Sequence, residues 1–274
     1  MDEFEFTRAT SLPRATAAFV KSADARYLAG GQTLLPVMKQ GLAAPASLVS
    51  LAHVPELADI TCTRDMITIG AMARHADVAA HGEIKKLIPA LSVLACGIAD
   101  PHVRNRGTIG GSLANNDPAA DYPAAVLGLG ATVVTTSITN AKRRITADDF
   151  FQGLFTTALE PGELITGIEF PVALRAGYIK FPHPASRYAL VGVMVSQGAS
   201  GVRVAVTGAG ACVFRVPAME DALARSFTPD ALAGITVPDT DLTSDRFGSA
   251  AYRAHLITVL ARRAVILALQ DNRS

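Results

Sequence analysis

The chain has 274 residues, a length that fits one large domain or two ordinary ones. Half of the residues are hydrophobic and only 18% are charged, which is typical of a compact protein with apolar surface left for contacts with other subunits. Lys and Arg number 25 against 24 Asp and Glu, so the chain lacks the basic field that attracts nucleic acid, and we expect no nucleic-acid partner.

Cysteine and histidine residues give no pattern of a metal site. Cys62, Cys96 and Cys212 lie far apart, unlike a disulfide framework or the clustered ligands of zinc and iron-sulfur centres. The six histidines form no ligand cluster either, because His75 and His81 are six residues apart and point to different faces of a helix. We expect buried, reduced thiols and no metal on this chain.

Hydropathy along the chain predicts no membrane span. The N-terminal stretch MDEFEFTRAT lacks the apolar core of a signal peptide, and the longest uncharged run, residues 122–141, is interrupted by glycines. These features predict a cytoplasmic protein.

The first 55 residues predict a small unit in which strands alternate with short helices. Ser11 and Pro13 are typical of a helix start, and apolar residues at 15–20 continue this helix to about residue 22. Strands are expected at 27–29 and 47–51, with a helical turn at 34–39 that Gly41 ends.

The pattern of predicted elements in the rest of the chain changes near residues 172–176. Before that boundary we expect paired strands at 60–63 and 66–69, helices at 75–81, 84–96 and 119–129, and strands at 131–136, 143–146 and 164–170. After it we expect antiparallel strands at 177–181, 189–196 and 202–207, a hairpin turn at 198–201, and helices at 217–225, 229–234 and 247–269.

Two glycine pairs mark the candidate site. Residues 29–36 read AGGQTLLP, and residues 108–112 read TIGGS; missing side chains in such loops let backbone N–H groups approach an anion closely. Hydroxyls at Thr33, Thr108 and Ser112 and the amide of Gln32 add polar groups that a simple turn does not need. Two amide-rich loops indicate a ligand with a pyrophosphate, although neither loop is a Walker motif.

Purely structural roles are the alternative to ligand binding for these glycines and aspartates. Glycine pairs usually serve turns, and Asp117 and Asp121 fit helix caps or charges that complement a helix dipole. Gly208 and Gly210 resemble the start of a dinucleotide fingerprint, but Val213 stands where its third glycine would be, so we interpret them as structural.

Three motifs in order, AGGQTLLPVMKQG, VRNRGTIGGSLANNDPAADYPA and ELITGIEFP, resemble the FAD-binding medium subunit of molybdenum hydroxylases, the family of carbon monoxide dehydrogenase and xanthine dehydrogenase. The resemblance covers essentially the whole chain. It implies an α+β fold with a two-subdomain FAD-binding domain of the PCMH/vanillyl-alcohol-oxidase type at residues 1–175, with subdomains at about 1–55 and 56–175. A small C-terminal α+β domain with antiparallel strands would follow at 176–274.

The same resemblance implies a set of cofactor-binding residues and no catalytic residue. Backbone amides of both glycine motifs would hold the FAD pyrophosphate, Asp121 would accept hydrogen bonds from the cofactor, and Tyr188 would lie near the flavin ring. Ile98, Ile165 and Lys180 match further FAD-contacting positions, although core packing is the alternative for Ile98, Ile165 and Tyr188. The motif residues are Ala29, Gly30, Gly31, Gln32, Thr33, Leu34, Leu35, Pro36, Thr108, Ile109, Gly110, Gly111 and Ser112.

Two departures from the family pattern affect the expected chemistry. The first loop commonly reads AGGHS in this branch, whereas Gln32 and Thr33 stand here, so side-chain contacts to the flavin would differ. The cysteine-rich insertion of a benzoyl-CoA-type branch is missing, and with it that branch's extra iron-sulfur cluster.

The function implied is electron transfer within a heterotrimeric molybdenum hydroxylase or dehydrogenase. FAD would sit on this chain, [2Fe-2S] clusters on a small partner subunit and the molybdopterin cofactor on a large one, as a dimer of heterotrimers. One alternative is a self-sufficient FAD-dependent oxidoreductase, but after the boundary only His183 and His255 stand out as acid/base groups. Another is a flavin-free scaffold, against which the intact glycines of both loops argue.

Overall fold

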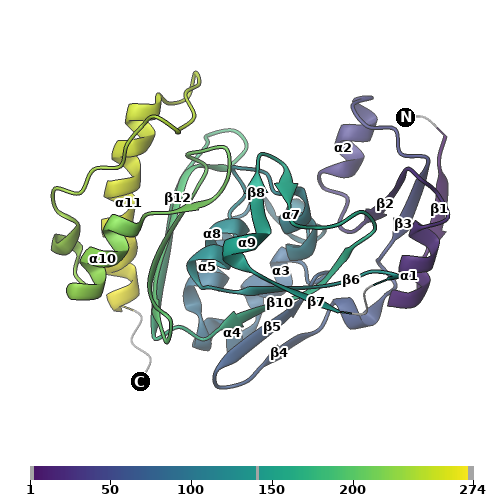
Figure 1. Cartoon of the computed structure of the whole chain (residues 1–274), viewed down its shortest axis with the longest axis horizontal. Coiled ribbons are helices and arrows are strands. Elements are labelled where there is room, and N and C mark those ends of the chain that lie inside the picture. Colours follow the sequence, from purple (N-terminus) through teal and green to yellow (C-terminus); the bar gives the residue numbers. More distant parts are fainter. Residues whose placement is uncertain (1–2, 140–141, 271–274) are drawn as a thin grey trace.

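The computed structural model describes residues 3–139 and 142–270. The main sheets have three, five and four strands. Figure 1 shows the first at the N-terminal end of the molecule, the second in the middle among helices, and the third at the C-terminal end, where α10 (Pro217–Arg225) and α11 (Ala250–Gln270) cover it. Helices and antiparallel sheets together confirm the α+β class. In the described part of the chain, no helix is both long and apolar enough to cross a bilayer.

The N-terminal unit is a parallel sheet of order β1-β3-β2, formed by β1 (Glu5–Arg8), β3 (Ser47–Ser50) and β2 (Ala25–Leu28). Parallel neighbours need crossovers, and α1 (Leu12–Phe19) and α2 (Leu34–Lys39) supply them. Ser11 caps α1 as expected, since its side chain accepts the Arg14 amide at 3.4 Å. The sequence analysis missed β1, whose four residues are all exposed and carry no apolar pattern.

The central unit is an antiparallel sheet of order β4-β5-β10-β6-β7 covered by helices. Its strands are β4 (Ile60–Cys62), β5 (Met66–Gly70), β10 (Leu164–Pro171), β6 (Thr132–Thr136) and β7 (Arg143–Thr146). Its helices are α3 (His75–Ala80), α4 (Gly82–Leu87), α5 (Pro89–Cys96), α6 (Pro101–Arg104), α7 (Ile109–Asn115) and α8 (Tyr122–Gly128), with the 3-10 turn η1 (Pro55–Leu57) before β4.

One predicted helix is wrong in this unit. The expected helix at 84–96 is divided into α4 and α5 at Ile88, which has φ −143° and ψ 72°. Pro89 explains the break, because a proline ring disfavours helical geometry in the residue before it.

The C-terminal sheet packs against one hydrophobic core on each of its two faces. It contains β11 (Arg175–Pro182), β12 (Ala189–Gly198), β13 (Gly201–Thr207) and β14 (Phe214–Arg215), all antiparallel. On β12, Val193 and Val195 pack with α10 (Pro217–Arg225) and α11 (Ala250–Gln270), whereas Met194 faces α8 and the central core. This alternation follows from the two-residue period of a strand. The expected helix at 229–234 is a 3-10 turn, η2 (Pro229–Leu232).

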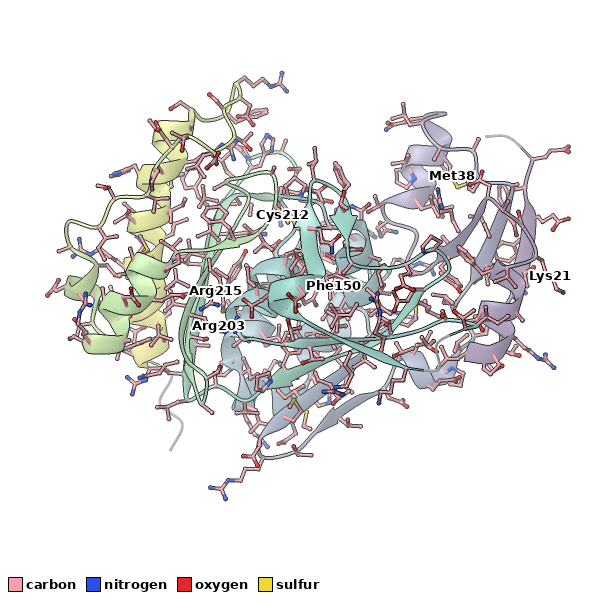
Figure 2. All side chains as sticks on the ribbon, in the orientation of Figure 1. Lys21, Met38, Phe150, Arg203, Cys212 and Arg215 are labelled. Atoms are coloured by element: carbon pink, nitrogen blue, oxygen red, sulfur yellow. The ribbon has the colours of Figure 1, made fainter. Side chains whose placement is uncertain are left out.

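A short connection between β7 and β10 was not predicted: α9 (Ala147–Phe150) followed by the hairpin β8 (Phe151–Gly153) and β9 (Thr156–Thr157). Asp148 of α9 pairs with Arg203 at 2.9 Å and with Arg215 at 3.1 Å, and Arg203 also donates to the Leu127 carbonyl at the end of α8. The two arginines lie side by side in Figure 2. They tie the C-terminal sheet to the central unit.

Candidate functional site

A large cavity opens where the three units meet. Its volume is about 1380 Å³, more than the roughly 300–1,000 Å³ typical of sites for drug-sized ligands. Its wall comes from the β2–α2 loop, from residues 98–121 of the central unit, from residues 155–165, and from residues 185–188 between β11 and β12. A cavity bounded by segments so distant in sequence suits one long ligand.

The β2–α2 loop brings unpaired amides to this wall. In the part of the chain that the structure describes, no protein acceptor receives the backbone N–H groups of Gly30, Gly31, Gln32 and Thr33. Gly31 has a left-handed φ of +72°, which turns the loop, and Thr33 precedes α2 without a side-chain hydrogen bond. We call residues 30–33 the amide cradle. Consecutive free N–H groups in such a turn form a concave anion site.

Gly30 is required by a close approach between two segments of the wall. A Cβ atom at this position would lie 2.0 Å from the Arg106 carbonyl oxygen and 2.8 Å from Gly107 Cα. The amide cradle therefore packs directly against the backbone that leads into α7. This contact brings the two glycine motifs of the sequence together.

The second glycine motif is helical, so the expectation of an open, amide-presenting loop is wrong there. Thr108 caps α7, and its Oγ1 accepts the Gly111 amide at 3.2 Å. The amides of Ile109 and Gly110 donate to the carbonyls of Ala73 and Ala71, and the Ser112 amide donates to the Thr108 carbonyl. What this motif presents to the cavity is a small, hydroxyl-bearing surface.

Asp121 lies in the cavity wall but is engaged by protein donors. Its Oδ1 accepts the Tyr178 hydroxyl at 2.5 Å and its Oδ2 accepts Lys180 Nζ at 2.9 Å, with the carboxylate side chain 4% exposed. Burial raises the pKa of the Asp121 carboxyl, and the Lys180 charge and the Tyr178 hydrogen bond oppose that shift. Since Tyr178 and Lys180 lie on β11, Asp121 anchors the C-terminal sheet at the cavity.

Residues 183–188, here called the rim segment, form the cavity edge on the C-terminal side. Lys180 Nζ donates to the Arg187 carbonyl at 2.8 Å, and the His183 ring accepts the amides of Ala185 and Ser186 at 3.2 Å. Tyr188 lines the cavity at the end of this segment, and burial raises the pKa of its phenol, with Asp117 and Asp121 adding to the shift.

His75 is a cavity residue that the sequence did not assign. It is 5% exposed, and burial next to the Arg104 charge lowers the pKa of its imidazole to about 4, so the ring is neutral at pH 7. Among the residues that the structure describes, none is a hydrogen-bond partner of its Nδ1. Within residues 3–139 and 142–270, no group of three or more His, Cys, Asp and Glu side chains is arranged to hold a metal ion. The cysteines are free thiols, but Cys96 is exposed and the other two are half-buried, so the expectation of buried thiols is wrong.

Most of the predicted site residues meet at the cavity, and four do not. Those in the wall are Ala29, Gly30, Gly31, Gln32, Thr33, Leu34, Ile98, Thr108, Gly110, Gly111, Ser112, Asp121, Ile165 and Tyr188. Leu35, Pro36, Ile109 and Lys180 are outside it. Leu35 packs its side chain on Gly31, Pro36 is exposed on α2, Ile109 is buried in the central core, and Lys180 acts through Asp121 and the rim segment.

The sequence analysis also missed wall residues, notably Tyr27, Asn115, Phe155, Leu159 and Arg187. The Tyr27 hydroxyl donates to the Gly162 carbonyl at 3.1 Å, which connects β2 to the segment before β10. Burial raises the pKa of Tyr27 to about 12. Asn115 lies within the second motif, whereas the other four residues belong to none, and only the tertiary fold brings all five to one cavity.

Comparison with known proteins identifies the family. Residues 2–173 match the model described as the FAD binding domain in molybdopterin dehydrogenase. The chain belongs to this family. It is 36% identical over 253 residues to the nicotine 6-hydroxylase medium subunit of Paenarthrobacter nicotinovorans, covering 89% of both chains. It is 34% identical over 279 residues to the carbon monoxide dehydrogenase medium chain of Afipia carboxidovorans, covering 96% of this chain and 95% of the relative.

Solved structures agree with this family. Reconstituted CO dehydrogenase from Oligotropha carboxidovorans superposes with a TM-score of 0.89 at 32% identity over 99% of both chains. Quinoline 2-oxidoreductase from Pseudomonas putida 86 gives 0.87 at 28% identity, over 100% of this chain and 99% of the other. The predicted membership in the FAD-binding subunits of molybdenum hydroxylases is confirmed.

The cavity fits the cofactor that the family implies. FAD is a long dinucleotide with a central pyrophosphate, and the cavity is both larger than an ordinary ligand site and equipped with four consecutive unpaired amides. Anions are stabilised by such clusters of backbone N–H groups. The donor set thus agrees with a pyrophosphate at the amide cradle.

Proposed function

We propose that this chain holds FAD in the cavity and passes electrons through it within a molybdenum-dependent hydroxylase or dehydrogenase. The observation that carries the proposal is the amide cradle, residues 30–33, facing a cavity of about 1380 Å³. Its amides bind the pyrophosphate, and the hydroxyls of Thr108 and Ser112 lie on the same wall. Bound FAD would take electrons from iron-sulfur clusters one at a time and deliver two to an acceptor.

The residues of this chain would bind and orient the cofactor and exclude water from it. Ile98, Ile165 and Tyr188 form wall surface against the cofactor, and Lys180 is a positioning residue that holds Asp121 and the rim segment. Gln32 and Thr33 are half of the amide cradle and line the cavity, so their side chains would meet the cofactor differently from the histidine and serine that the family more often has there.

The rival of a self-sufficient oxidoreductase needs an acid or base group beside its substrate, and neither of the two histidines that stand out in the sequence lies in the cavity wall. His183 uses its ring to accept two backbone amides of the rim segment, and His255 is exposed on α11, outside the cavity wall. Proton transfer to an organic substrate needs such a group within hydrogen-bond reach. The rival of a flavin-free scaffold leaves the amide cradle and its cavity without a role.

The proposed function includes partner subunits. We propose a small iron-sulfur subunit and a large molybdopterin subunit, assembled as a dimer of heterotrimers in the cytoplasm. The relatives described above are themselves named medium chains or medium subunits. We also propose that residues 1–175 form the FAD-binding domain, with subdomains at about 1–55 and 56–175, and that 176–274 form the C-terminal domain; the sheet boundaries support this division.

Expression of the chain alone tests the proposal. The purified protein should retain FAD with absorbance near 450 nm but show no flavin reduction by organic substrates under anaerobic conditions. Reduction should appear only after both partner subunits are added. Bleaching of the flavin by an organic substrate with the single chain would instead support the self-sufficient oxidoreductase, and a colourless protein that binds no added FAD would support the scaffold.

A further inference from the structure

Backbone strain outside glycine is concentrated at the cavity. In the described part of the chain, left-handed φ angles at other residues occur at Ala99 (41°), Asn116 (44°), Phe155 (52°) and Arg187 (62°). Three of these line the cavity, and the fourth, Asn116, holds the hairpin that carries Phe155. Such conformations are unfavourable for residues with a Cβ atom, and they collect at ligand sites where the surrounding structure enforces them.

Among the three strained wall residues, Phe155 is the one with a large apolar side chain. It occupies the tip of the β8–β9 hairpin, which Figure 1 shows near α7, and its side chain is 56% exposed. The neighbouring Leu154 is also 56% exposed but is not part of the cavity wall. An exposed phenyl ring in a strained backbone position gains nothing from burial in the core. Its placement at the cavity needs another reason.

Asn116 fixes the tip of the β8–β9 hairpin by hydrogen bonds. Asn116, 1% exposed at the end of α7, donates Nδ2 to the carbonyls of Gly153 and Thr156, each at 2.8 Å. These two carbonyls flank the tip, so both of its ends are tied to α7. Cys212, labelled in Figure 2, adds a contact of 3.6 Å to the same Nδ2. The ring of Phe155 is therefore presented on a preorganised support.

We propose that Phe155 binds a planar aromatic ring of the cofactor by stacking, and that the strained tip of the β8–β9 hairpin exists to place it. This inference rests on the proposed FAD function and deepens it. FAD carries two planar aromatic systems, adenine and isoalloxazine, and aromatic rings attract one another in offset-stacked or edge-to-face arrangements. Tyr188 supplies a second aromatic side chain, from the rim segment.

Equilibrium titration of the apoprotein with FAD tests the proposal. Phe155→Ala should raise the Kd for FAD about tenfold, while Phe155→Tyr, which keeps a ring, should stay within about twofold of the wild type. Leu154→Ala is the matched control, equally exposed but outside the wall, and should also stay within about twofold. A Phe155→Ala variant that binds FAD as tightly as Leu154→Ala would overturn the proposal.

A second variant separates the ring from the strain. Phe155→Gly removes both, since glycine tolerates a positive φ, so it should unfold at a higher denaturant concentration than Phe155→Ala yet bind FAD equally weakly. Full FAD affinity in Phe155→Gly would show that the ring makes no contact and would overturn the proposal. Failure of the wild-type chain to bind FAD would instead refute the proposed function together with this inference.

Partial ligands identify the stacked ring. The chain contains no tryptophan, so Phe155→Trp introduces a single tryptophan at the tip, whose emission can be excited selectively at 295 nm, and Leu154→Trp is a matched reference. A change in emission on adding ADP, seen only with Phe155→Trp, would assign adenine; the same result with FMN would assign isoalloxazine. Equal responses of the two tryptophan variants to both ligands would contradict stacking.

Discussion

Gly30→Ala is the substitution that the structure opposes most directly. The new Cβ would lie 2.0 Å from the Arg106 carbonyl oxygen, whereas ordinary contacts begin at 3.4 Å, so the two backbone segments would have to separate by about 1.4 Å. Both segments are main chain and no flexible side chain can yield. Gly31→Ala would meet a movable Leu35 side chain but would also impose a φ of +72° on alanine.

The expected loss can be scaled from the amide cradle. A hydrogen bond to a charged acceptor contributes about 1.5–3 kcal/mol, so displacing one amide from the pyrophosphate should weaken FAD binding about 10- to 150-fold. Overpacking should also lower the unfolding free energy by about 1–3 kcal/mol. Gly111→Ala should be milder, since its Cβ meets mainly the Thr108 hydroxyl at 2.9 Å.

FAD titration of the apoprotein and urea denaturation measure these two effects. Gly82→Ala is the control, because Gly82 is exposed and its added Cβ would have no neighbour within 4 Å. It should leave FAD affinity unchanged. Wild-type FAD affinity in Gly30→Ala would refute the argument that the amide cradle packed on Arg106 forms the pyrophosphate site.

Three further predictions concern stability. The pKa of His75 falls from 6.5 in the unfolded chain to about 4 in the folded one, so protonation below pH 6.5 favours unfolding. Between pH 6.5 and 4 the unfolding free energy of the wild type, measured by urea titration, should fall by up to about 3 kcal/mol more than that of His75→Gln. Equal pH dependence in the two proteins would contradict this. Asp121→Asn should reduce the unfolding free energy by about 3–5 kcal/mol, because Lys180, which is 11% exposed, loses its buried partner. A loss below about 1 kcal/mol would show that the pair is not buried in solution. Arg203→Ala should cost about 1–3 kcal/mol by removing bonds to Asp148 and the Leu127 carbonyl, and an unchanged thermal unfolding midpoint would argue against this tie between the C-terminal sheet and the central unit.

The sequence predicted elements wherever periodicity or caps are local. Ser11 and Pro13 marked α1, and the alternating apolar residues of β12 and β13 marked the C-terminal sheet. It failed where tertiary contacts override local preference. The Gly110–Gly111 pair has low helix propensity, yet α7 forms because Thr108 caps it and Ala71 and Ala73 accept its first amides.

The candidate site was predictable only as far as its motifs extend. Both glycine pairs do meet at one cavity, but for Gly30 and Gly110 the reason is close packing on Arg106 and Ala71 rather than access for an anion alone. Phe155 and His75 carried no motif signal, because their place in the wall depends on the hairpin fixed by Asn116 and on the contact between α3 and the backbone at Gly107.

A structure of the chain with bound FAD tests the central claim most directly. The pyrophosphate oxygens should lie about 2.7–3.2 Å from amide nitrogens of the cradle, residues 30–33, which are unpaired in the described structure. Phosphates bound elsewhere in the cavity, with these four amides still facing water, would contradict the account.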